Sequence, residues 1–349
     1  MSTFLIYGAT GYTGRLCAEH AVARGLRPVL AGRSVDAVRG FAERLGLEWR
    51  AFGLETPAAV RDGLAGIEAV LHAAGPFSAT SRPMAEACLT TATHYVDITG
   101  EIDVIEALAA RSGEAEAAGI MLLPGAGFDV VPSDCLAAHV AGRLPGATRL
   151  RISIGGFQGI SRGTAKTMVE GVACGTRMRR GGRIVEIADT PRASADFGSG
   201  PRSAIGLGWG DVATAWYSTR IPDIDVFFQA SPSLARAAAM PRPFKRLLAT
   251  GFSQVLLKRA IERLAAPGPT PEERARSRCL FLAEAWDDSG LRVASRMESP
   301  EGYTLTALTA VEIARRAAQG EASPGFQTPA TAYGADFILS FEGIERRDL

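Results

Sequence analysis

The chain has 349 residues, and its 38 basic and 37 acidic side chains leave a formal net charge of +1. This balance, with no long run of like charge, argues against DNA, RNA or another polyanion as a general partner. The hydrophobic share of 47% and the charged share of 21% are typical of a globular protein, and the length is sufficient for two domains.

The five cysteines are scattered, and no CxxC pair or Cys/His cluster occurs, so the sequence predicts no metal site. An odd, dispersed cysteine count favours a reducing compartment, and we expect a cytoplasmic location. The N-terminus shows no signal-peptide pattern. No uncharged apolar stretch reaches about 18 residues, so no membrane-spanning helix is expected.

The first 130 residues alternate apolar runs with helical patterns. The runs "TFLIYG", "RPVLAG", "LEWRAFGL", "IEAVLHAAG", "THYVDITG" and "GIMLLPGAG" are expected to be strands. Helical patterns follow at about residues 15–24, 35–45, 81–90 and 102–118. This alternation predicts an α/β fold whose N-terminal domain is a Rossmann domain with a doubly wound parallel sheet.

Small and polar residues gather just after five of these runs. The clusters lie at residues 8–14, 32–34, 74–77, 97–101 and 125–129. In an open α/β sheet, ligands bind outside the carboxyl ends of the strands. Five clusters at one edge therefore predict a binding site there.

The first cluster, "GATGYTG", follows a strand and opens a helix. Gly8 suits a tight turn, Gly11 allows a phosphate to approach the backbone, and Gly14 allows the helix to pack closely on the strand. The helix N-terminus then faces the anion. The residues predicted to hold the pyrophosphate of a dinucleotide are Gly8, Thr10, Gly11, Tyr12, Thr13 and Gly14. Their spacing, G-x-x-G-x-x-G, differs from the usual fingerprint.

The end of the second strand indicates which dinucleotide is bound. NAD-binding folds usually carry an Asp or Glu there, but this strand ends "LAGRS". Arg33 and Ser34 occupy the place where the 2′-phosphate of NADP would lie, and a guanidinium pairs well with phosphate. We therefore predict NADPH as the cofactor.

The motifs "YGATGYTG", "AGRS", "AAGPFS", "YVDITGE" and "GFDVVPSD" follow one another at successive strand ends. In this order they resemble the saccharopine dehydrogenase-like oxidoreductases, in the branch that holds the trans-acting enoyl reductases. The resemblance implies that the loop of Ala74, Gly75, Pro76 and Phe77 lies by the nicotinamide. It also implies that Asp97, Thr99 and Glu101 border the cleft.

The second half reads as an α+β domain with an antiparallel or mixed sheet. Strands are expected near residues 148–157, 182–187, 204–212 and 224–230, with a hairpin at 278–298. Helices are expected at 161–175 and 305–320. We assign residues 1–130 to the Rossmann domain and 131–324 to a substrate and dimerisation domain. A C-terminal segment, 325–349, is expected to return to the first domain.

Hydride-transfer enzymes need few acid–base groups, because the cofactor carries the hydride. The candidate catalytic residues are Asp97, Glu101 and Lys166, and Tyr95, Tyr217 and Tyr303 are further candidate proton donors. Asp97 also suits a structural acid at a strand end, and Lys166 a surface lysine. The four histidines are expected to be structural. No tyrosine has a lysine four residues later, which excludes the short-chain reductases.

Three functions stay open. The first is an NADP-dependent reductase acting on an activated C=C bond of an acyl or polyketide-like substrate, as the resemblance implies. The second is an imine reductase or amine dehydrogenase of saccharopine type. The third is an NADPH-binding sensor or scaffold without turnover. Residues 244–266 form an amphipathic pattern that suits peripheral membrane contact, a lipid-like substrate, or packing in a homodimer.

Overall fold

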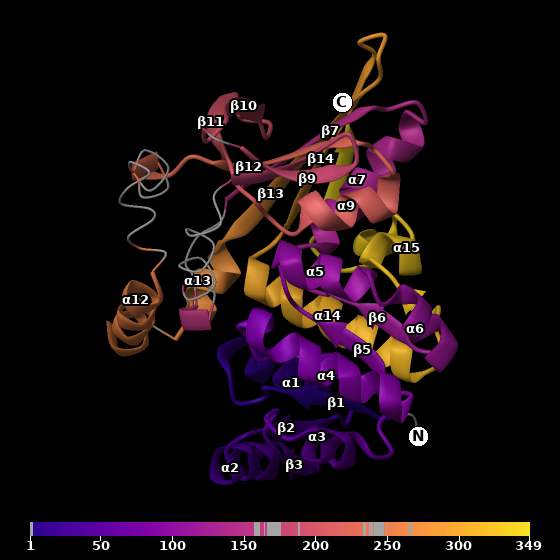
Figure 1. Ribbon diagram of the computed structural model, residues 1–349. Coiled ribbons are helices and arrows are strands. Elements are labelled where there is room, and N and C mark those ends of the chain that lie inside the picture. Colours follow the sequence, from indigo (N-terminus) through magenta and orange to yellow (C-terminus); the bar gives the residue numbers. More distant parts are fainter. Residues whose placement is uncertain are drawn as a thin grey trace. The chain divides into compact units, whose positions relative to one another are not determined.

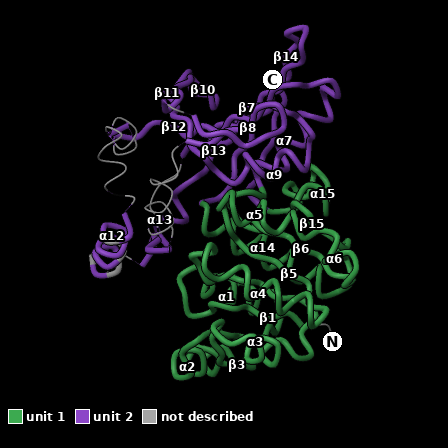
Figure 2. Tube along the Cα trace, in the orientation of Figure 1, with its two compact units in different colours: residues 1–131, 302–341 green, residues 132–301, 342–349 purple. Residues whose placement is uncertain are grey.

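A computed structural model of the protein describes residues 3–156, 161–163, 165, 176–187, 189–232, 235–236, 240, 248, 250–264 and 267–349. The chain divides into two compact units, which are coloured separately in Figure 2. Unit 1 comprises residues 1–131 and 302–341, and unit 2 comprises residues 132–301 and 342–349.

Unit 1 is built on a seven-stranded sheet in which every pairing is parallel. In sheet order its strands are β15 (Gly325–Phe326), β6 (Met121–Leu123), β5 (His94–Asp97), β4 (Ala69–His72), β1 (Phe4–Tyr7), β2 (Val29–Gly32) and β3 (Trp49–Ala51). The six predicted strands are confirmed, and the order reverses at β1, as in a Rossmann fold. The predicted fold class is therefore correct.

Helices connect these strands, as a parallel sheet requires. They are α1 (Tyr12–Ala23), α2 (Val35–Leu45), α3 (Pro57–Leu64), α4 (Phe77–Thr91), α5 (Ile102–Ala109), α6 (Ser112–Ala118), α14 (Gly302–Ala318), α15 (Pro329–Tyr333) and the 3₁₀ helix η1 (Phe337–Ser340). The helix predicted at 102–118 is instead two helices that meet at Ala110 and Arg111. Ser112 and Gly113, which are poorer helix formers than the flanking alanines, stand at this break, and the prediction did not take them into account.

Unit 2 contains a mixed sheet, in agreement with the predicted α+β class. The main path runs β10 (Arg192–Asp196), β11 (Pro201–Gly206), β12 (Asp223–Gln229), β7 (Arg149–Gly155), β13 (Arg278–Trp286), β14 (Arg292–Pro300) and β16 (Glu345–Asp348). The hairpin of β8 (Thr176–Arg180) and β9 (Arg183–Ile187) joins it at β12. Strands β7 and β12 are parallel, whereas β13 and β14 form the predicted antiparallel hairpin.

The described helices of unit 2 are α7 (Val131–Arg143), α9 (Asp211–Thr219), α12 (Gly251–Leu264) and α13 (Pro271–Arg276); they are labelled in Figure 1. The strand predicted at 204–212 ends at Gly206, and Asp211 begins α9. Gly208 and Gly210 interrupt the apolar run, and an acid suits a helix N-terminus. Within the described ranges, no helix is long and apolar enough to cross a membrane.

The predicted boundary at residue 324 is wrong, because α14 belongs to unit 1. This helix is buried over most of its surface and packs against α1, β4 and β5. The final residues also differ from the prediction, since β16 pairs with β14 in unit 2. A helical pattern reveals that a segment is helical, but it does not reveal which sheet the helix covers.

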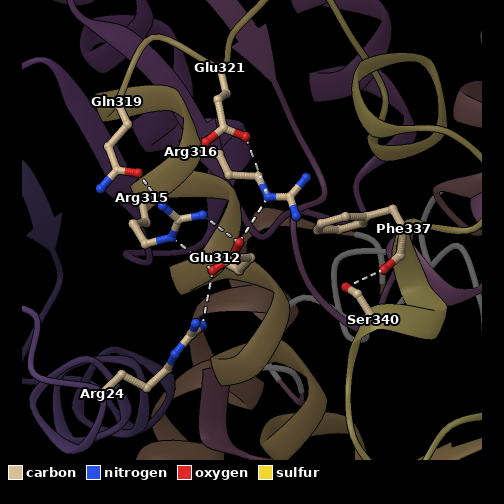
Figure 3. Close-up of polar contacts among 8 residues, drawn as sticks. All are labelled: Arg24, Glu312, Arg315, Arg316, Gln319, Glu321, Phe337 and Ser340. Atoms are coloured by element: carbon tan, nitrogen blue, oxygen red, sulfur yellow. Dashed lines mark hydrogen bonds and ion pairs between the residues drawn. The ribbon is translucent and has the colours of Figure 1, made fainter.

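A charge cluster ties α14 to α1 within unit 1 (Figure 3). Glu312 is buried and accepts hydrogen bonds from Arg24 on α1 and from Arg315 and Arg316 on its own helix, at 2.7–3.0 Å. Arg316 also stacks over Phe337, 5.2 Å from the ring centroid. These contacts join three segments that are far apart in the sequence.

Candidate functional site

The glycine loop between β1 and α1 has the backbone that the sequence predicts. Gly8 has φ +83°, and a Cβ there would lie 2.9 Å from Ala73 and Ala74 backbone atoms. A Cβ on Gly14 would collide with the carbonyl oxygen of Gly8 and lie 2.9 Å from the Cα of Ala9. Both positions therefore require glycine for close packing between the loop, the neighbouring strand end and α1.

The N-terminus of α1 is open to an anion. Gly11 is its N-cap and supplies no side-chain hydrogen bond, and no acid lies in the first turn. The hydroxyls of Thr10 and Thr13 make no hydrogen bond to any described residue. Tyr12 packs edge-on against Tyr303 of α14, with ring centroids 5.0 Å apart. Backbone N–H groups and two hydroxyls are thus available where a dinucleotide pyrophosphate binds.

Arg33 follows β2 directly and is exposed. Among the residues described, its guanidinium has no hydrogen-bond or ion-pair partner. Ser34 is the N-cap of α2 and accepts a hydrogen bond from the Ala37 N–H at 3.4 Å. No acid stands at the end of β2, so this edge can receive a phosphate.

The loop from Ala74 to Phe77 joins β4 to α4 and is held from two sides. The Thr80 hydroxyl donates to the carbonyl oxygens of Ala74 and Pro76, at 2.7 and 3.1 Å. Glu101 accepts hydrogen bonds from the N–H groups of Phe77 and Ser78, at 2.9 and 2.8 Å. The Glu101 carboxylate therefore caps α4 and holds the loop that the resemblance places at the nicotinamide.

Asp97, at the end of β5, is fully buried and joins three neighbouring segments. Its carboxylate accepts hydrogen bonds from the Tyr95 hydroxyl at 2.6 Å and from the N–H groups of Thr99 and Gly125 at 2.9 and 3.0 Å. Burial raises the pKa of Asp97 to about 6, although these hydrogen bonds oppose the rise. This geometry suits the structural role of Asp97 that the sequence left open. Tyr95 is also fully buried, and its hydroxyl donates its hydrogen bond to Asp97.

Asp129 is a half-buried carboxyl that sequence reasoning did not single out. It packs against Gly100, where a Cβ would lie 3.1 Å from the Asp129 Oδ2. Burial, and then the charge of Glu101, raise the pKa of Asp129 to about 7. The only signal in the sequence was its place in the cluster 125–129 after a strand. A carboxyl that holds its proton near neutral pH can serve as an acid.

Two threonines of α14 position the loop that carries Asp129. The Thr306 hydroxyl accepts a hydrogen bond from the Phe128 N–H at 3.0 Å, and the Thr309 hydroxyl donates to the Ala126 carbonyl oxygen at 2.7 Å. Gly127 lies where a Cβ would be 2.7 Å from Thr306 Cγ2. The placement of Asp129 therefore depends on a helix almost 180 residues away in the sequence.

Two further candidate donors are not part of the described residues of unit 1. Lys166 and most of the helix predicted at 161–175 lie outside the described residues. Tyr217 lies on α9 of unit 2, where Arg220 stacks over its ring at 5.8 Å. Among the described residues, no group of three His, Cys, Asp or Glu side chains is arranged to hold a metal ion.

Three of the four histidines have contacts that suit structural roles. His72 is fully buried, and burial lowers its pKa to about 3, while its Nε2 lies 3.0 Å from the Thr80 hydroxyl. His94 accepts a hydrogen bond from the Met121 N–H at 2.9 Å. His139 pairs with Asp348 in unit 2 at 2.8 Å.

Comparison with known proteins agrees with this geometry. The protein family described as NAD(P)H-binding matches residues 8–110, which contain the glycine loop, Arg33 and Glu101. A Mycobacterium tuberculosis protein provisionally named a trans-acting enoyl reductase is 32% identical over 183 residues, covering 48% of this chain and 43% of the relative. The trans-acting enoyl reductase of Mycobacterium leprae is 35% identical over 138 residues, covering 37% and 33%. The chain thus matches less than half the length of these relatives.

Among solved structures, the saccharopine dehydrogenase (L-Glu forming) of Saccharomyces cerevisiae matches over 100% of both chains. The TM-score is 0.67 at 10% sequence identity, so this likeness concerns the fold. The chain is thus similar over part of its length to NAD(P)H-binding proteins and to the trans-acting enoyl reductases, and it shares its fold with saccharopine dehydrogenase.

Proposed function

We propose that this chain is an NADPH-dependent reductase of an activated C=C bond in an acyl substrate. The observation that carries the cofactor assignment is Arg33, an exposed guanidinium with no described partner, at a strand end that lacks an acid. A 2′-phosphate would pair with this guanidinium, whereas the ribose hydroxyl of NADH offers it no charge.

The residues of unit 1 fit a dinucleotide. Gly8, Gly11 and Gly14 leave the room that a pyrophosphate needs beside the backbone, and α1 presents its N-terminus without a capping side chain. Glu101 and Thr80 hold the loop 74–77, which by the resemblance would lie by the nicotinamide. The bound cofactor would supply the hydride.

Reduction of a conjugated C=C bond also requires a proton at the carbon next to the carbonyl. Asp129 is the carboxyl of this edge that keeps its proton near neutral pH, and we assign it that transfer. Its carboxyl O–H would break as the new C–H bond forms, leaving a carboxylate. Asp97, which is fully buried and bound by three neighbours, would position the loops on either side.

The C=C assignment rests on the relatives, which are named enoyl reductases. The experiment is NADPH oxidation, followed at 340 nm, with a panel of enoyl thioesters and a parallel panel of keto-acid and amine pairs. Turnover of enoyl thioesters is expected. Turnover of the keto-acid and amine pairs alone would favour imine reduction instead. Tight NADPH binding without turnover of either panel would favour a sensor or scaffold.

A lipid-like substrate and peripheral membrane contact stay predictions. On α12, Val255 and Leu256 are 50% and 59% exposed, which agrees with an apolar ligand or surface nearby. Flotation with vesicles of anionic phospholipid tests the membrane contact, and a protein that stays at the bottom of the gradient would contradict it. A cytoplasmic location and a homodimer are proposed on the sequence arguments alone.

A further inference from the structure

Unit 2 contains a cavity of about 340 Å³ at its mixed sheet, and every residue that lines it belongs to unit 2. It is lined by Ser194, Asp196, Pro201, Leu282, Glu284, Arg292, Arg296 and Leu349. These residues come from β10, β11, β13, β14 and the end of the described chain. Four of these residues are charged: Asp196, Glu284, Arg292 and Arg296. A gap left by core packing is usually lined by apolar side chains, so this lining points to a polar ligand.

On the sheet face that carries Leu282 and Glu284, two buried polar atoms have no hydrogen-bond partner among the described residues. Ser153 lies directly opposite Leu282 across β7 and β13, and Arg151 lies opposite Glu284, so these pairs share a face of the sheet. Ser153 is fully buried, and neither its Oγ nor the Nε of Arg151 has a partner among the described residues. Buried polar atoms are rarely left unsatisfied, so this face is adapted to a polar ligand or to ordered water.

The acidic groups at the cavity are already occupied. Glu284 accepts hydrogen bonds from Arg292 at 2.7 and 3.0 Å and lies 3.8 Å from Arg151. Asp196 accepts hydrogen bonds from the N–H groups of Gly198 and Gly200, at 2.7 and 3.1 Å.

Arg296 is the charge that nothing described neutralises. Arg296 lines the cavity, and its guanidinium makes no hydrogen bond or ion pair with any residue that the structure describes. The turn after β10 packs on it: a Cβ on Gly198, which has φ +108°, would collide with this guanidinium. The lining holds two arginines and two carboxylates, Asp196 and Glu284, but both carboxylates already accept hydrogen bonds from other groups, whereas Arg296 makes none with the described residues.

We propose that this cavity is a binding site for a small oxyanion, a phosphate or a carboxylate group, with Arg296 as its main ligand and Arg292 beside it. A guanidinium binds either group through two parallel hydrogen bonds. The volume admits a molecule of a few heavy atoms. The site lies wholly within unit 2, so it stands or falls independently of the cofactor assignment in unit 1.

The experiment is isothermal titration calorimetry of the whole chain at low ionic strength, with sodium phosphate in one arm and sodium succinate in the other. Because phosphate can also bind the glycine loop, each titration is repeated with saturating NADPH. We expect millimolar binding of at least one probe, and Arg296→Gln should weaken it about tenfold or more, since hydrogen bonds to charged groups are the strong ones. The probe affinity of Arg296→Lys, which keeps the charge, should lie between those of the unsubstituted protein and Arg296→Gln.

Arg183→Gln is the matched control, because this exposed arginine on β9 is remote from the cavity lining, and it should leave binding unchanged. NADPH affinity and thermal unfolding should be the same in all variants, which shows that the fold is kept. Binding of phosphate alone would identify the ligand group as a phosphate, and binding of succinate alone would identify it as a carboxylate. No binding of either probe up to about 20 mM, or binding that Arg296→Gln leaves intact, would overturn the proposal. If the unsubstituted protein binds a probe but does not bind NADPH, the proposed function is contradicted and the cavity proposal stands.

Discussion

At the scale of single residues, Arg33 and Asp129 illustrate two kinds of functional signal. Arg33 stands in the chain directly after a strand, and the motif around it is the basis of the role that we propose for it. Asp129 acquires its high pKa from burial and from Glu101, a residue 28 positions earlier. The first signal is local in sequence, and the second exists only after folding.

Arg33→Ala should raise the dissociation constant for NADPH about 10- to 100-fold, because a charge-assisted pair contributes roughly 1.5–3 kcal/mol. The constant for NADH should change little, since that cofactor has no 2′-phosphate. Fluorescence titration with both cofactors measures the two constants. Arg39→Ala is the control, because Arg39 already pairs with Asp36 at 2.8 Å. Equal shifts for the two cofactors would contradict the assignment.

Asp129→Asn should lower kcat about 100-fold or more, because the amide has no acidic proton to donate. In the unsubstituted protein, kcat should fall as the pH rises through about 7, where Asp129 loses its proton. In the variant that limb of the pH profile should vanish. If Asp129 had only a structural role, Asp129→Asn would lower kcat but keep the shape of its pH profile. Measurement of kcat against pH for both proteins therefore distinguishes a proton donor from a structural residue.

The raised pKa of Asp129 also predicts a stability effect. The folded state holds this proton more tightly than the unfolded chain, so its contribution is complete below pH 3.8 and is lost as the pH rises through about 7. Asp129→Asn should therefore gain stability relative to the unsubstituted protein as the pH increases over this interval. Urea unfolding at several pH values measures the difference.

At the scale of elements, α14 contributes more to unit 1 than its place in the sequence suggests. It covers β4 and β5, packs on α1, and positions the loop that carries Asp129. Glu312 is its charged anchor. Burial alone would raise the pKa of Glu312, but hydrogen bonds from Arg315, Arg316 and Arg24 outweigh burial and lower the pKa to about 2.

Glu312→Gln should lower the free energy of unfolding by about 2 kcal/mol at pH 7, because three arginines lose their shared carboxylate. A lowered pKa stabilises the fold above pH 4.5, and this contribution is lost as the pH falls through about 2. The difference in the free energy of unfolding between Glu312→Gln and the unsubstituted protein should therefore become smaller as the pH falls toward 2. Glu321→Gln, an exposed residue 4.0 Å from Arg316, should change stability by about 0.5 kcal/mol or less. Equal effects of the two substitutions would contradict this account.

At the scale of the whole molecule, unit 1 is discontinuous in sequence. A fragment of residues 1–131 lacks α14, so it would expose the apolar faces of α1, β4 and β5 that this helix covers. We expect the fragment to unfold without cooperativity and to bind no NADPH. Joining residues 302–341 to it through a flexible linker should restore both properties, as measured by circular dichroism and fluorescence titration. A fragment 1–131 that unfolds cooperatively would show that α14 is dispensable.

The sequence by itself determined the Rossmann order of unit 1, the glycine loop and the Arg33 position, because strand periodicity and turn residues act between near neighbours in the chain. It also indicated a mixed sheet in unit 2. Only the tertiary structure decided that α14 belongs to unit 1, that Glu101 caps α4, that Asp129 lies beside Gly100, and that Arg296 faces a cavity without a described partner. Each of these depends on contacts between segments far apart in the chain, and such contacts leave no periodic pattern in the sequence.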